Sequence, residues 1–585
     1  MKKSIRLLSL LLSLIVISLT VISCSEGLLD NQNKSTESNS TAQTDSSGKK
    51  IPFYDDSTCI MLFTDGKYVT NVVVPDIASE AEKMIYARIR AELKSKTGVN
   101  PSYTTDLVPA GQTRNPDEYA ILVGKTNHDE AKQIADSASY GDYLIKIIGN
   151  KINIFFNAKT EGEELINIFI KSIKTDGNGS YWVERNLSIS KQALPQLSGL
   201  PTYPSNETTI VDCRDSTSMI VANRTTLDAF KGYCTALEEC GFTLYSSRDN
   251  VNGNYFKTFV KGGLAVTAYF TPSSKTARII AGPATDIPTK DIDTTPETVT
   301  PSLTLLSQGS RYNNGLGMIY LLPNGKFLII DGGYVRSAQL LSKLKALAPD
   351  PHNIVITAWY VTHTHGDHQQ TLNSFIRDNA KNVKIESVLY NYTTTEQYNS
   401  ITTGADGANS ATQFESNLAK YLDESTKIIK PHTGQIYNYG STQVEILYTV
   451  EDYLPETLNY LNTSSLVIRV TIGEHSMLAL ADTTHVSGDI LKNNFGAYLQ
   501  SEMVQLAHHG THPGYASLYE TVKGQVLLWP SNLENAKSTI TDNAVATAVK
   551  HASDVYVANS GDVTLSIPYT IVNNKQEFLD SIGGT

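Results

Sequence analysis

Three of the chain's twelve histidines lie within the six residues His363-Thr364-His365-Gly366-Asp367-His368, which also contain a carboxylate. Imidazole nitrogens and carboxylate oxygens are the ligands that borderline metals such as Zn²⁺ prefer. The hexapeptide follows the run 354–361, whose β-branched and aromatic residues predict a buried strand. Ligands placed just past the end of a strand share a tight loop, so they can converge on one ion. The pattern therefore favours a metal site over a polar loop that merely happens to be rich in histidine.

Other apolar runs in the same half of the chain also end in residues that can bind metal. One run ends in Asp331, a second in Asp482 and a third in the pair His508-His509. A single strand that ends in Asp or His means little by itself. Four such endings, spaced as they would be within one domain, favour a shared site.

The spacing His-x-His-x-Asp-His is the signature of the metallo-β-lactamase fold, and the chain resembles that superfamily from about residue 299 to residue 585. The resemblance implies an αββα sandwich with a one- or two-metal site at one edge of the sheets. We expect Zn²⁺, with Mn²⁺ as an alternative, as the cofactor. The metal ligands that the resemblance implies are His363, His365, Asp367, His368, Asp482 and His509.

The resemblance also assigns roles within this set. The first two histidines would hold one ion and the Asp-His pair a second, with Asp482 between the ions and His509 as the last ligand. Asp331 would orient the ligand loop. His508 would contact the substrate or donate a proton, and we expect it to take part in catalysis together with Asp367.

Two positions depart from the family pattern. Many members carry a His before the strand that precedes the bridging aspartate, where this chain has Asn462, and a Gly just before that aspartate, where it has Ala481. We place Asn462 beside the ligands rather than among them. The first ion would then have fewer protein ligands, and His432 is a possible substitute. The Asn-Thr-Ser-Ser-Leu-Val sequence, followed later by His-His-Gly, is similar to the hydrolase domain of ComEC-type competence proteins and to phosphorylcholine esterases.

These residues indicate hydrolysis. A metal ion with an open position lowers the pKa of a bound water to roughly 7, which supplies a hydroxide nucleophile. Two ions about 3.5–4 Å apart suit in-line attack on a phosphodiester, and the similarity to competence-type domains favours extracellular nucleic acid or phosphorylated envelope polymers. An ester or lactone hydrolase and a non-catalytic surface binding lipoprotein are the alternatives. Tyr334, Tyr392 and Tyr515 are candidate substrate contacts because they lie near the ends of the motifs.

The N-terminus resembles a bacterial lipoprotein signal. Within residues 1–23, a basic start precedes an apolar stretch, and the small residue Ser23 stands before Cys24. Cleavage before Cys24 and lipidation of its thiol would anchor the protein to the membrane, outside the cytoplasm. An ordinary secretory signal or an anchor helix is the alternative. Residues 24–51 are rich in Ser, Thr, Asn and Asp, which predicts a flexible tether.

The rest of the chain divides at two proline-containing stretches. A chain of 585 residues is too long for one core, and residues 192–206 and 283–298 predict exposed connectors. We expect an α/β accessory domain at 52–192, a small α+β domain at 207–282 and the hydrolase domain at 299–585. The first resembles the N-terminal accessory domain of glycoside hydrolases. The second carries no chemistry that we can identify, and we expect a spacer or adaptor.

Local patterns within the first two domains predict their elements. Residues 79–97 place apolar side chains on one helical face, with Gly98 as a stop. Two strands should pair across Gly149-Asn150, which is a hairpin signal. A further helix is expected at about 225–239.

Charge and cysteine content limit the partners. The net charge of −11 argues against stable binding to a nucleic acid backbone, although metal ions in a nuclease site could supply positive charge locally. No second apolar span of about eighteen residues follows the signal, whereas a competence-type channel needs many. The four cysteines besides Cys24 lack CxxC pairing and metal-finger spacing. One long-range disulfide and free buried thiols both remain open.

Overall fold

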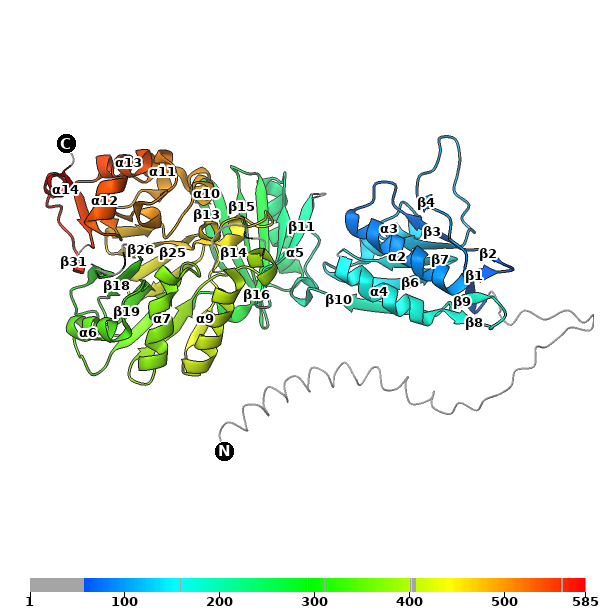
Figure 1. Ribbon diagram of the computed structural model, residues 1–585, viewed down its shortest axis with the longest axis horizontal. Helices are drawn as coiled ribbons and strands as arrows, with labels where there is room; N and C mark the ends of the chain where they lie inside the picture. The colour runs from blue at the N-terminus through cyan, green and yellow to red at the C-terminus, as the bar shows by residue number, and fades with distance from the viewer. Residues whose placement is uncertain are drawn as a thin grey trace, which may run out of the picture. The chain divides into compact units, whose positions relative to one another are not determined.

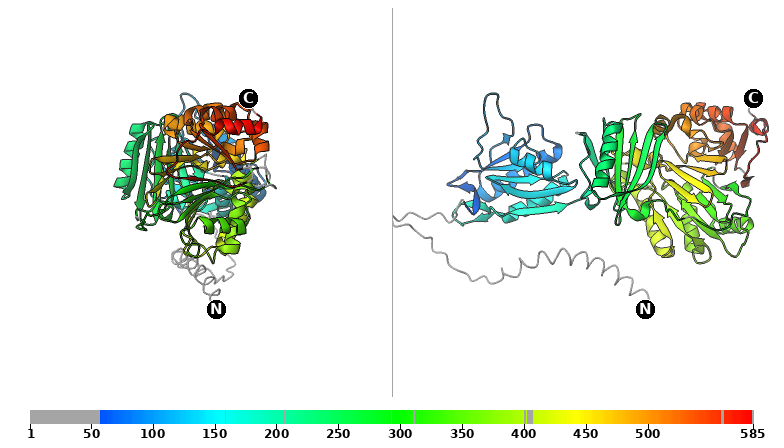
Figure 2. Two further views of the ribbon diagram at one scale, coloured as in Figure 1. Left: turned by 90° about the vertical axis from the view of Figure 1, so that its left-hand side faces the viewer. Right: turned by 180° about the vertical axis from the view of Figure 1, so that it is seen from behind.

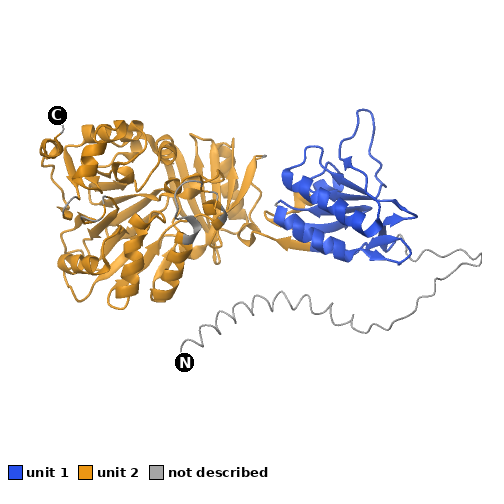
Figure 3. Cartoon of the chain, in the orientation of Figure 1, with its two compact units in different colours: residues 1–133, 144–189 blue, residues 134–143, 190–585 orange. Residues whose placement is uncertain are grey.

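The computed structural model describes residues 57–157, 159–205, 207–291, 293–309, 312, 314–399, 401, 407–558 and 561–583 (Figure 1). The expected signal, Cys24 and the expected tether lie outside the described residues. The chain forms two compact units, residues 1–133 with 144–189 and residues 134–143 with 190–585 (Figure 3). In the described part of the chain, we find no helix long and apolar enough to span a membrane.

Unit 1 alternates helices and strands, as its sequence predicts. Helix α2 (Glu80–Thr97) begins with a capping box at Ser79 and ends at Gly98, which has a φ of 76°. Strands β6 (Asp142–Ile148) and β7 (Lys151–Phe155) form the expected antiparallel hairpin. A six-stranded sheet has the order β10-β6-β7-β5-β3-β4, and a smaller sheet has the order β2-β1-β9-β8.

The remaining bounds in this region are β1 (Cys59–Thr64), β2 (Lys67–Tyr68), β3 (Asn71–Val74), β4 (Thr104–Thr105), β5 (Ala120–Val123), α3 (Asp129–Ser137), α4 (Lys159–Ser172), β8 (Lys174–Thr175), β9 (Tyr181–Glu184) and β10 (Ser188–Gln192). None of the expected metal ligands lies in unit 1.

Unit 2 begins with an antiparallel sheet, which we call the proximal sheet. Its order is β11 (Thr208–Asp212), β12 (Ser218–Ala222), β16 (Thr276–Pro283), β15 (Leu264–Thr271), β14 (Asn254–Lys261), β13 (Thr243–Val251). One face packs against helix α5 (Leu227–Glu239), and the expected helix at 225–239 is thereby confirmed. The opposite face contributes Met219, Tyr269 and Ile280 to a core that it shares with residues of 447–582. The segment 207–282 is therefore packed into the same unit as 299–585.

The two stretches expected as exposed connectors are partly buried, which corrects that expectation. Leu197 and Tyr203 lie in the hydrophobic core between α5 and the proximal sheet. In the second stretch, Asp286 is buried, and Asp293 forms an ion pair of 2.9 Å with Lys326. Proline spacing predicts irregular backbone but does not show which apolar side chains a neighbouring sheet will cover.

Two further sheets form the rest of unit 2. The first has the order β23-β22-β20-β19-β18-β17-β31, with β21 paired to β20, and the second has the order β24-β25-β26-β27-β28-β29-β30. The bounds in the first sheet are β17 (Ser302–Leu305), β18 (Gly317–Leu321), β19 (Phe327–Asp331), β20 (Val355–Tyr360), β21 (Lys384–Ile385), β22 (Ser387–Leu389), β23 (Lys427–Ile429) and β31 (Val563–Ser566). The bounds in the second sheet are β24 (Ile436–Tyr439), β25 (Thr442–Tyr448), β26 (Val467–Ile472), β27 (His475–Ala479), β28 (Met503–Gln505), β29 (Val526–Trp529) and β30 (Asp554–Val557).

The two sheets pack face to face with helices outside, which the views of Figure 2 also show. Leu328 and Ile330 of β19 point into the core between the sheets, while Ile329 points to the outer helices. This alternation is the period-2 pattern of a strand with two apolar faces. The outer helices of the first sheet are α6 (Ser337–Leu347), α7 (Gly366–Asn379) and α9 (Gly407–Tyr421); those of the second are α10 (His485–Phe495), α11 (Ala516–Val522) and α13 (Asn543–His551).

The strand directions place the candidate ligands at one edge of the sandwich. Strands β19 and β20 are parallel, and so are β27 and β28. The carboxyl ends of parallel neighbours meet at the same edge of a sheet. At that edge the two sheets are joined by a hydrogen bond of 3.0 Å from Leu466 N to Thr362 O. The mixed α/β class expected from the sequence is confirmed, and its strand ends converge.

The described cysteines resolve one open alternative. Cys59, Cys213 and Cys234 are buried free thiols, and Cys240 is a half-buried one. Burial raises the pKa of the Cys234 thiol to about 12, which keeps it protonated and inert. The long-range disulfide is therefore not formed among these four residues.

Candidate metal centre

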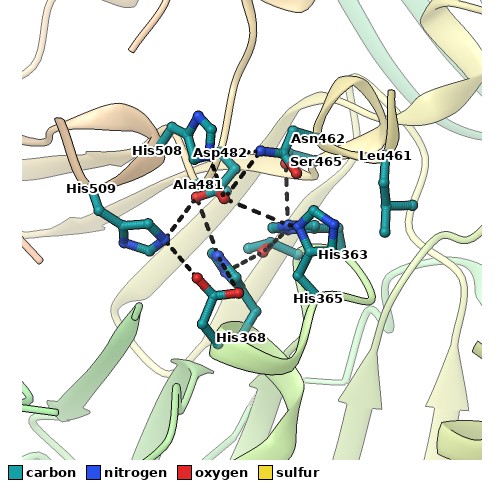
Figure 4. Close-up of polar contacts among 12 residues, drawn as sticks. His363, His365, His368, Leu461, Asn462, Ser465, Ala481, Asp482, His508 and His509 are labelled. Carbon is teal, nitrogen blue, oxygen red and sulfur yellow. Dashed lines mark hydrogen bonds and ion pairs between the residues drawn. The ribbon is translucent and has the colours of Figure 1, made fainter. Parts of the chain in front are cut away.

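The structure gathers the expected ligands into two groups that share one carboxylate (Figure 4). Within each group, the ligand atoms all lie within 4.8 Å of one another. The members of the first group are His363, His365 and Asp482; those of the second are Asp367, His368, Asp482 and His509. Asp482 thus lies between the two groups, where the resemblance places the bridging aspartate.

Four chain segments supply these side chains. His363 and His365 lie in the loop after β20, and Asp367 and His368 lie in the first turn of α7. Asp482 follows β27, and His509 lies in the turn after β28. Figure 4 shows the side chains of His363, His368 and His509 directed towards Asp482 from different elements.

Several ligand atoms in the second group are buried and contact only one another. These atoms are His368 Nε2, Asp482 Oδ1 and His509 Nε2, which make no hydrogen bond outside the group. His368 Nε2 and His509 Nε2 lie 3.2 Å and 3.4 Å from Asp482 Oδ1, and His509 Nε2 lies 3.1 Å from Asp367 Oδ2. Buried nitrogen and carboxylate atoms are costly unless a cation or hydrogen bonds compensate them. The donor set therefore fits a divalent cation such as Zn²⁺, which takes His nitrogen and carboxylate oxygen.

The first group has fewer protein ligands. His363 Nε2 lies 3.0 Å from His365 Nδ1 and 3.7 Å from Asp482 Oδ2. Burial, followed by the neighbouring His368, holds the pKa of His363 well below its usual value. A neutral imidazole can use its nitrogen lone pair as a metal ligand. The two candidate positions are thus chemically similar but unequal in ligand number.

The acidic and basic side chains of the second group shift each other's pKa values towards the charged forms. Burial opposes the ionisation of Asp482, yet the imidazoles of His368 and His509 lower its pKa well below the usual value. The pKa of His368 is raised well above its usual value, because Asp482 and Asp331 outweigh the effect of burial.

Asp331 holds the ligand loop in place. Its carboxylate accepts hydrogen bonds from Thr362 N at 2.8 Å and Thr362 Oγ1 at 2.7 Å. Its Oδ2 also lies 2.7 Å from His368 Nδ1. Because Nδ1 of His368 is occupied by Asp331, its Nε2 is directed into the second group. This is the geometry expected of a residue that orients a ligand.

The backbone is strained at several of these positions. Asp331, Ala481, His508 and His509 have φ values of 54°, 48°, 46° and 56°. Non-glycine residues rarely adopt positive φ, and such strain clusters at functional sites. Glycine would adopt the conformation of Ala481 without a steric cost.

Asn462 contacts the shared carboxylate through its amide nitrogen. Nδ2 lies 3.3 Å from Asp482 Oδ2, 3.3 Å from Tyr460 Oη and 3.1 Å from His508 Nε2. The reverse orientation of the amide would place its oxygen against the carboxylate oxygen, so the contact with Asp482 fixes the nitrogen in this position. Asn462 therefore lies beside the ligands, and its amide nitrogen donates to the carboxylate of Asp482.

His508 lies at the rim of the site, outside both ligand groups. Its Nε2 lies 3.8 Å from Asp482 Oδ2 and faces the Asn462 amide. The side chain is 19% exposed, and burial lowers its pKa.

His432 is paired elsewhere, and it belongs to neither ligand group. Its Nδ1 lies 2.8 Å from Glu451 Oε2, and both side chains are buried. Arg278 of the proximal sheet donates hydrogen bonds to the carbonyl oxygens of Glu451 and Asp452. The alternative in which His432 replaces the missing ligand is not supported by this placement.

The three tyrosines expected near the substrate have different environments. Tyr392 is only 1% exposed and lies in the core, so that expectation is wrong for a substrate contact. Tyr334 is half-buried beside Gly366 and stacks on Tyr312 with a centroid distance of 4.1 Å. Tyr515 is 53% exposed and packs against His485. Proximity to a motif in sequence does not fix the direction of a side chain.

Sequence reasoning missed three residues of the site. Thr362 and Ser465 lie 3.2 Å and 3.4 Å from Nδ1 of His363 through their hydroxyl oxygens. Tyr460 contacts Asn462. Thr362 immediately precedes the hexapeptide and could have been found by its position, whereas nothing in the local sequence distinguishes Tyr460.

Comparison with known proteins gives matches only among solved structures. No family model and no curated protein matches the chain. The chain is similar to the metallo-β-lactamase fold protein YhfI from Bacillus subtilis, at 15% identity and a TM-score of 0.29, over 46% of this chain and 99% of that one. It is similar to Zn²⁺-bound PqqB from Methylobacterium extorquens, at 12% identity and a TM-score of 0.29, over 45% and 99%. Human tRNase Z, short form, matches at 12% identity and a TM-score of 0.26, over 46% and 99%.

Proposed function

We propose that this protein is a metal-dependent hydrolase that acts on phosphodiesters. The observation that carries the proposal is the pair of ligand groups around Asp482, with buried ligand atoms that lack any other partner. His363 and His365 would hold one ion, while Asp367, His368 and His509 would hold a second. Zn²⁺ best suits this donor set, and Mn²⁺ is the alternative.

The bound metal would supply Lewis acidity and lower the pKa of a water molecule. The protein's own residues prepare the site for this chemistry. Asp331 fixes the ring of His368, and Asn462 holds Asp482 through its amide. His363 and His509 are fully buried, while Asp367 and His508 are partly exposed, so solvent reaches the site beside these two residues.

The shared carboxylate favours phosphodiesters among the possible substrates. Two neighbouring metal positions can stabilise both the attacking and the leaving oxygen of an in-line displacement at phosphorus. Extracellular nucleic acid or a phosphorylated envelope polymer would present such a bond. The net charge of −11 is consistent with brief contact with a substrate rather than stable binding of nucleic acid.

We also propose that Cys24 carries a lipid that anchors the protein outside the cytoplasm. The support is the basic and apolar sequence that precedes this cysteine. In the native host, the wild type should incorporate labelled palmitate, and Cys24→Ala should abolish the incorporation. A wild type without the label would contradict lipidation as the anchor.

The hydrolase proposal is tested with the full chain, because the proximal sheet shares its core with the sandwich. We would measure turnover of bis(4-nitrophenyl) phosphate after loading with Zn²⁺ or Mn²⁺. Metal-dependent turnover that His365→Ala abolishes is the expected result. The matched control is His475→Ala, since His475 lies on β27 and pairs with Glu502 outside both ligand groups.

Other results would redirect the proposal. Turnover of 4-nitrophenyl acetate but not of the phosphodiester would assign the site to carboxylic esters or lactones. Bound metal without turnover of either substrate would favour a surface binding lipoprotein. Turnover that His365→Ala leaves intact would place the chemistry elsewhere in the chain.

A further inference from the structure

Tyr460 lies at the mouth of the metal centre, on the element that carries Asn462. It immediately precedes the short helix η5 (Leu461–Ser464), and its side chain is half-buried. Its hydroxyl oxygen is 3.3 Å from Asn462 Nδ2, which is itself 3.3 Å from Asp482 Oδ2. The rings of Tyr460 and His508 have a centroid distance of 6.4 Å. Tyr460 therefore borders the shared carboxylate together with the two residues at the rim.

The direction of the hydrogen bond leaves the phenolic hydrogen free. An amide nitrogen donates only, so the Tyr460 oxygen accepts from Asn462. Among the described residues, this is the one hydrogen bond that the Tyr460 hydroxyl makes. Its own O–H is thus available to a group that enters the site. Asp482 fixes the Asn462 amide, which in turn fixes the position of the phenol.

The other residue at the rim is His508, whose Nε2 lies 3.1 Å from the same amide nitrogen. That nitrogen has two hydrogens for three neighbouring side chains, Asp482, Tyr460 and His508. An amide nitrogen cannot accept the hydroxyl hydrogen of Tyr460, so that hydrogen is directed away from the amide.

We infer that Tyr460 is a catalytic residue that donates its phenolic proton to the leaving oxygen of the phosphodiester; this inference rests on the proposed function. Water oxygen forms the new bond to phosphorus as the bond from phosphorus to the leaving oxygen breaks. The leaving oxygen takes the Tyr460 proton and departs as an alcohol. The proton released by the water restores the tyrosine through the solvent. Atoms and charge balance without any oxidant or reductant.

The test is Tyr460→Phe, which keeps the ring and removes only the hydroxyl. We would measure kcat and KM for aryl phosphodiesters that differ in leaving group: 4-nitrophenol, 4-cyanophenol and phenol. A proton donor matters most when the leaving oxygen is basic, and general acid catalysis contributes about 10²–10⁴-fold. We expect kcat to fall less than about 3-fold for 4-nitrophenol and at least about 10²-fold for phenol. KM and bound metal should not change.

Tyr453→Phe is the matched control. Tyr453 lies on the same stretch of chain, and its hydroxyl donates to the backbone oxygen of Thr457 at 3.1 Å, outside the site. It should show the same dependence on leaving group as the wild type. Metal content and thermal unfolding of both variants, measured in parallel, would show whether either one has lost the site itself.

The outcomes separate the two proposals. If the wild type with bound metal hydrolyses none of the aryl phosphodiesters, the proposed function fails and the role of Tyr460 fails with it. If the wild type turns them over and Tyr460→Phe loses activity equally for all three leaving groups, or loses none, only the role of Tyr460 is overturned. A loss of metal in Tyr460→Phe would also overturn proton donation and make Tyr460 a structural support.

Discussion

Two regions of unit 2 bury histidine against carboxylate, and they differ in how many ligand atoms converge. At the metal centre, three or four ligand atoms lie within 4.8 Å of one another in each group. At the junction with the proximal sheet, His432 meets Glu451 at 2.8 Å and belongs to neither group. Convergence of several ligands, rather than burial of a histidine, is what separates a candidate metal site from an ion pair.

The surroundings reinforce this difference. The metal centre lies at the partly open edge of the sandwich, where Asp367 is 17% exposed and His508 is 19% exposed. Glu451 and His432 are closed in by the proximal sheet, whose Arg278 donates to the neighbouring carbonyl groups. Burial opposes the ionisation of Glu451, yet His432 lowers its pKa below the usual value. The first region is thus partly accessible to solvent, whereas the second is buried between the proximal sheet and the sandwich.

The largest expected effect comes from removing the carboxylate that the two ligand groups share. Asp482→Ala should release metal from both positions and lower kcat at least about 10³-fold, since several kcal/mol of transition-state stabilisation depend on the metal. Elemental analysis after dialysis and turnover of bis(4-nitrophenyl) phosphate would measure these losses, with His475→Ala as the control. Full metal content in Asp482→Ala would remove the basis for treating this region as a metal centre.

At the junction, the expected effect is on stability instead of metal. His432→Ala should lower the free energy of unfolding by about 3–5 kcal/mol, because it leaves the Glu451 carboxylate buried without its partner. Metal content should remain that of the wild type. Urea unfolding measures the change, and His475→Ala, which breaks a half-exposed pair with Glu502, should cost less than about 1 kcal/mol. Loss of one metal equivalent in His432→Ala would show that His432 is a metal ligand and that the two regions form one site.

A smaller effect, on metal affinity, is expected from replacing Asp331, which contacts the ligand His368. Asp331→Asn should weaken metal binding about 10–100-fold, since the carboxylate orients His368 through Nδ1. Competition with a chromogenic chelator would measure the affinity. Asp293→Asn, which alters a carboxylate paired with Lys326 away from both ligand groups, is the control. Equal affinities for Asp331→Asn and the wild type would show that the loop holds its shape without this contact.

The smallest effect concerns backbone strain. Ala481 has a φ of 48°, where an L side chain costs about 1–2 kcal/mol and glycine does not. Part of that gain is offset by the greater freedom of glycine in the unfolded chain, so Ala481→Gly should raise the free energy of unfolding by about 0.5–1 kcal/mol. Ala479→Gly, within strand β27, should lower it. If both substitutions destabilise the protein in urea, the positive φ of Ala481 does not carry the cost in stability that we assign to it.

Much of the site was predictable from the sequence because its signals are local. The run 354–361 and the hexapeptide 363–368 predict a strand that ends in ligands, and the structure has β20 followed by that loop. Helix α2 was predictable for the same reason, since Ser79 and Gly98 are its own start and stop. Each of these signals needs only the residues within a few positions of it.

Other features could not be predicted because they depend on contacts between distant parts of the chain. His432 is a plausible ligand until Glu451 and the proximal sheet close around it. Tyr392 follows a strand like a site residue, yet its side chain turns into the core. Leu197 and Tyr203 lie in a stretch with the composition of a linker, but α5 and the proximal sheet bury them.

The sequence by itself determined which residues could bind a metal and that they end successive strands. The tertiary structure alone decided that Asn462 turns its amide nitrogen to Asp482. It also decided that, in the described part of the chain, the Tyr460 hydroxyl bonds to that amide alone. The physical reason is how far apart in the sequence the interacting residues lie. Strand and helix patterns follow from neighbouring residues, whereas the direction of a hydrogen bond and the closure of a ligand group are set by packing across the whole unit.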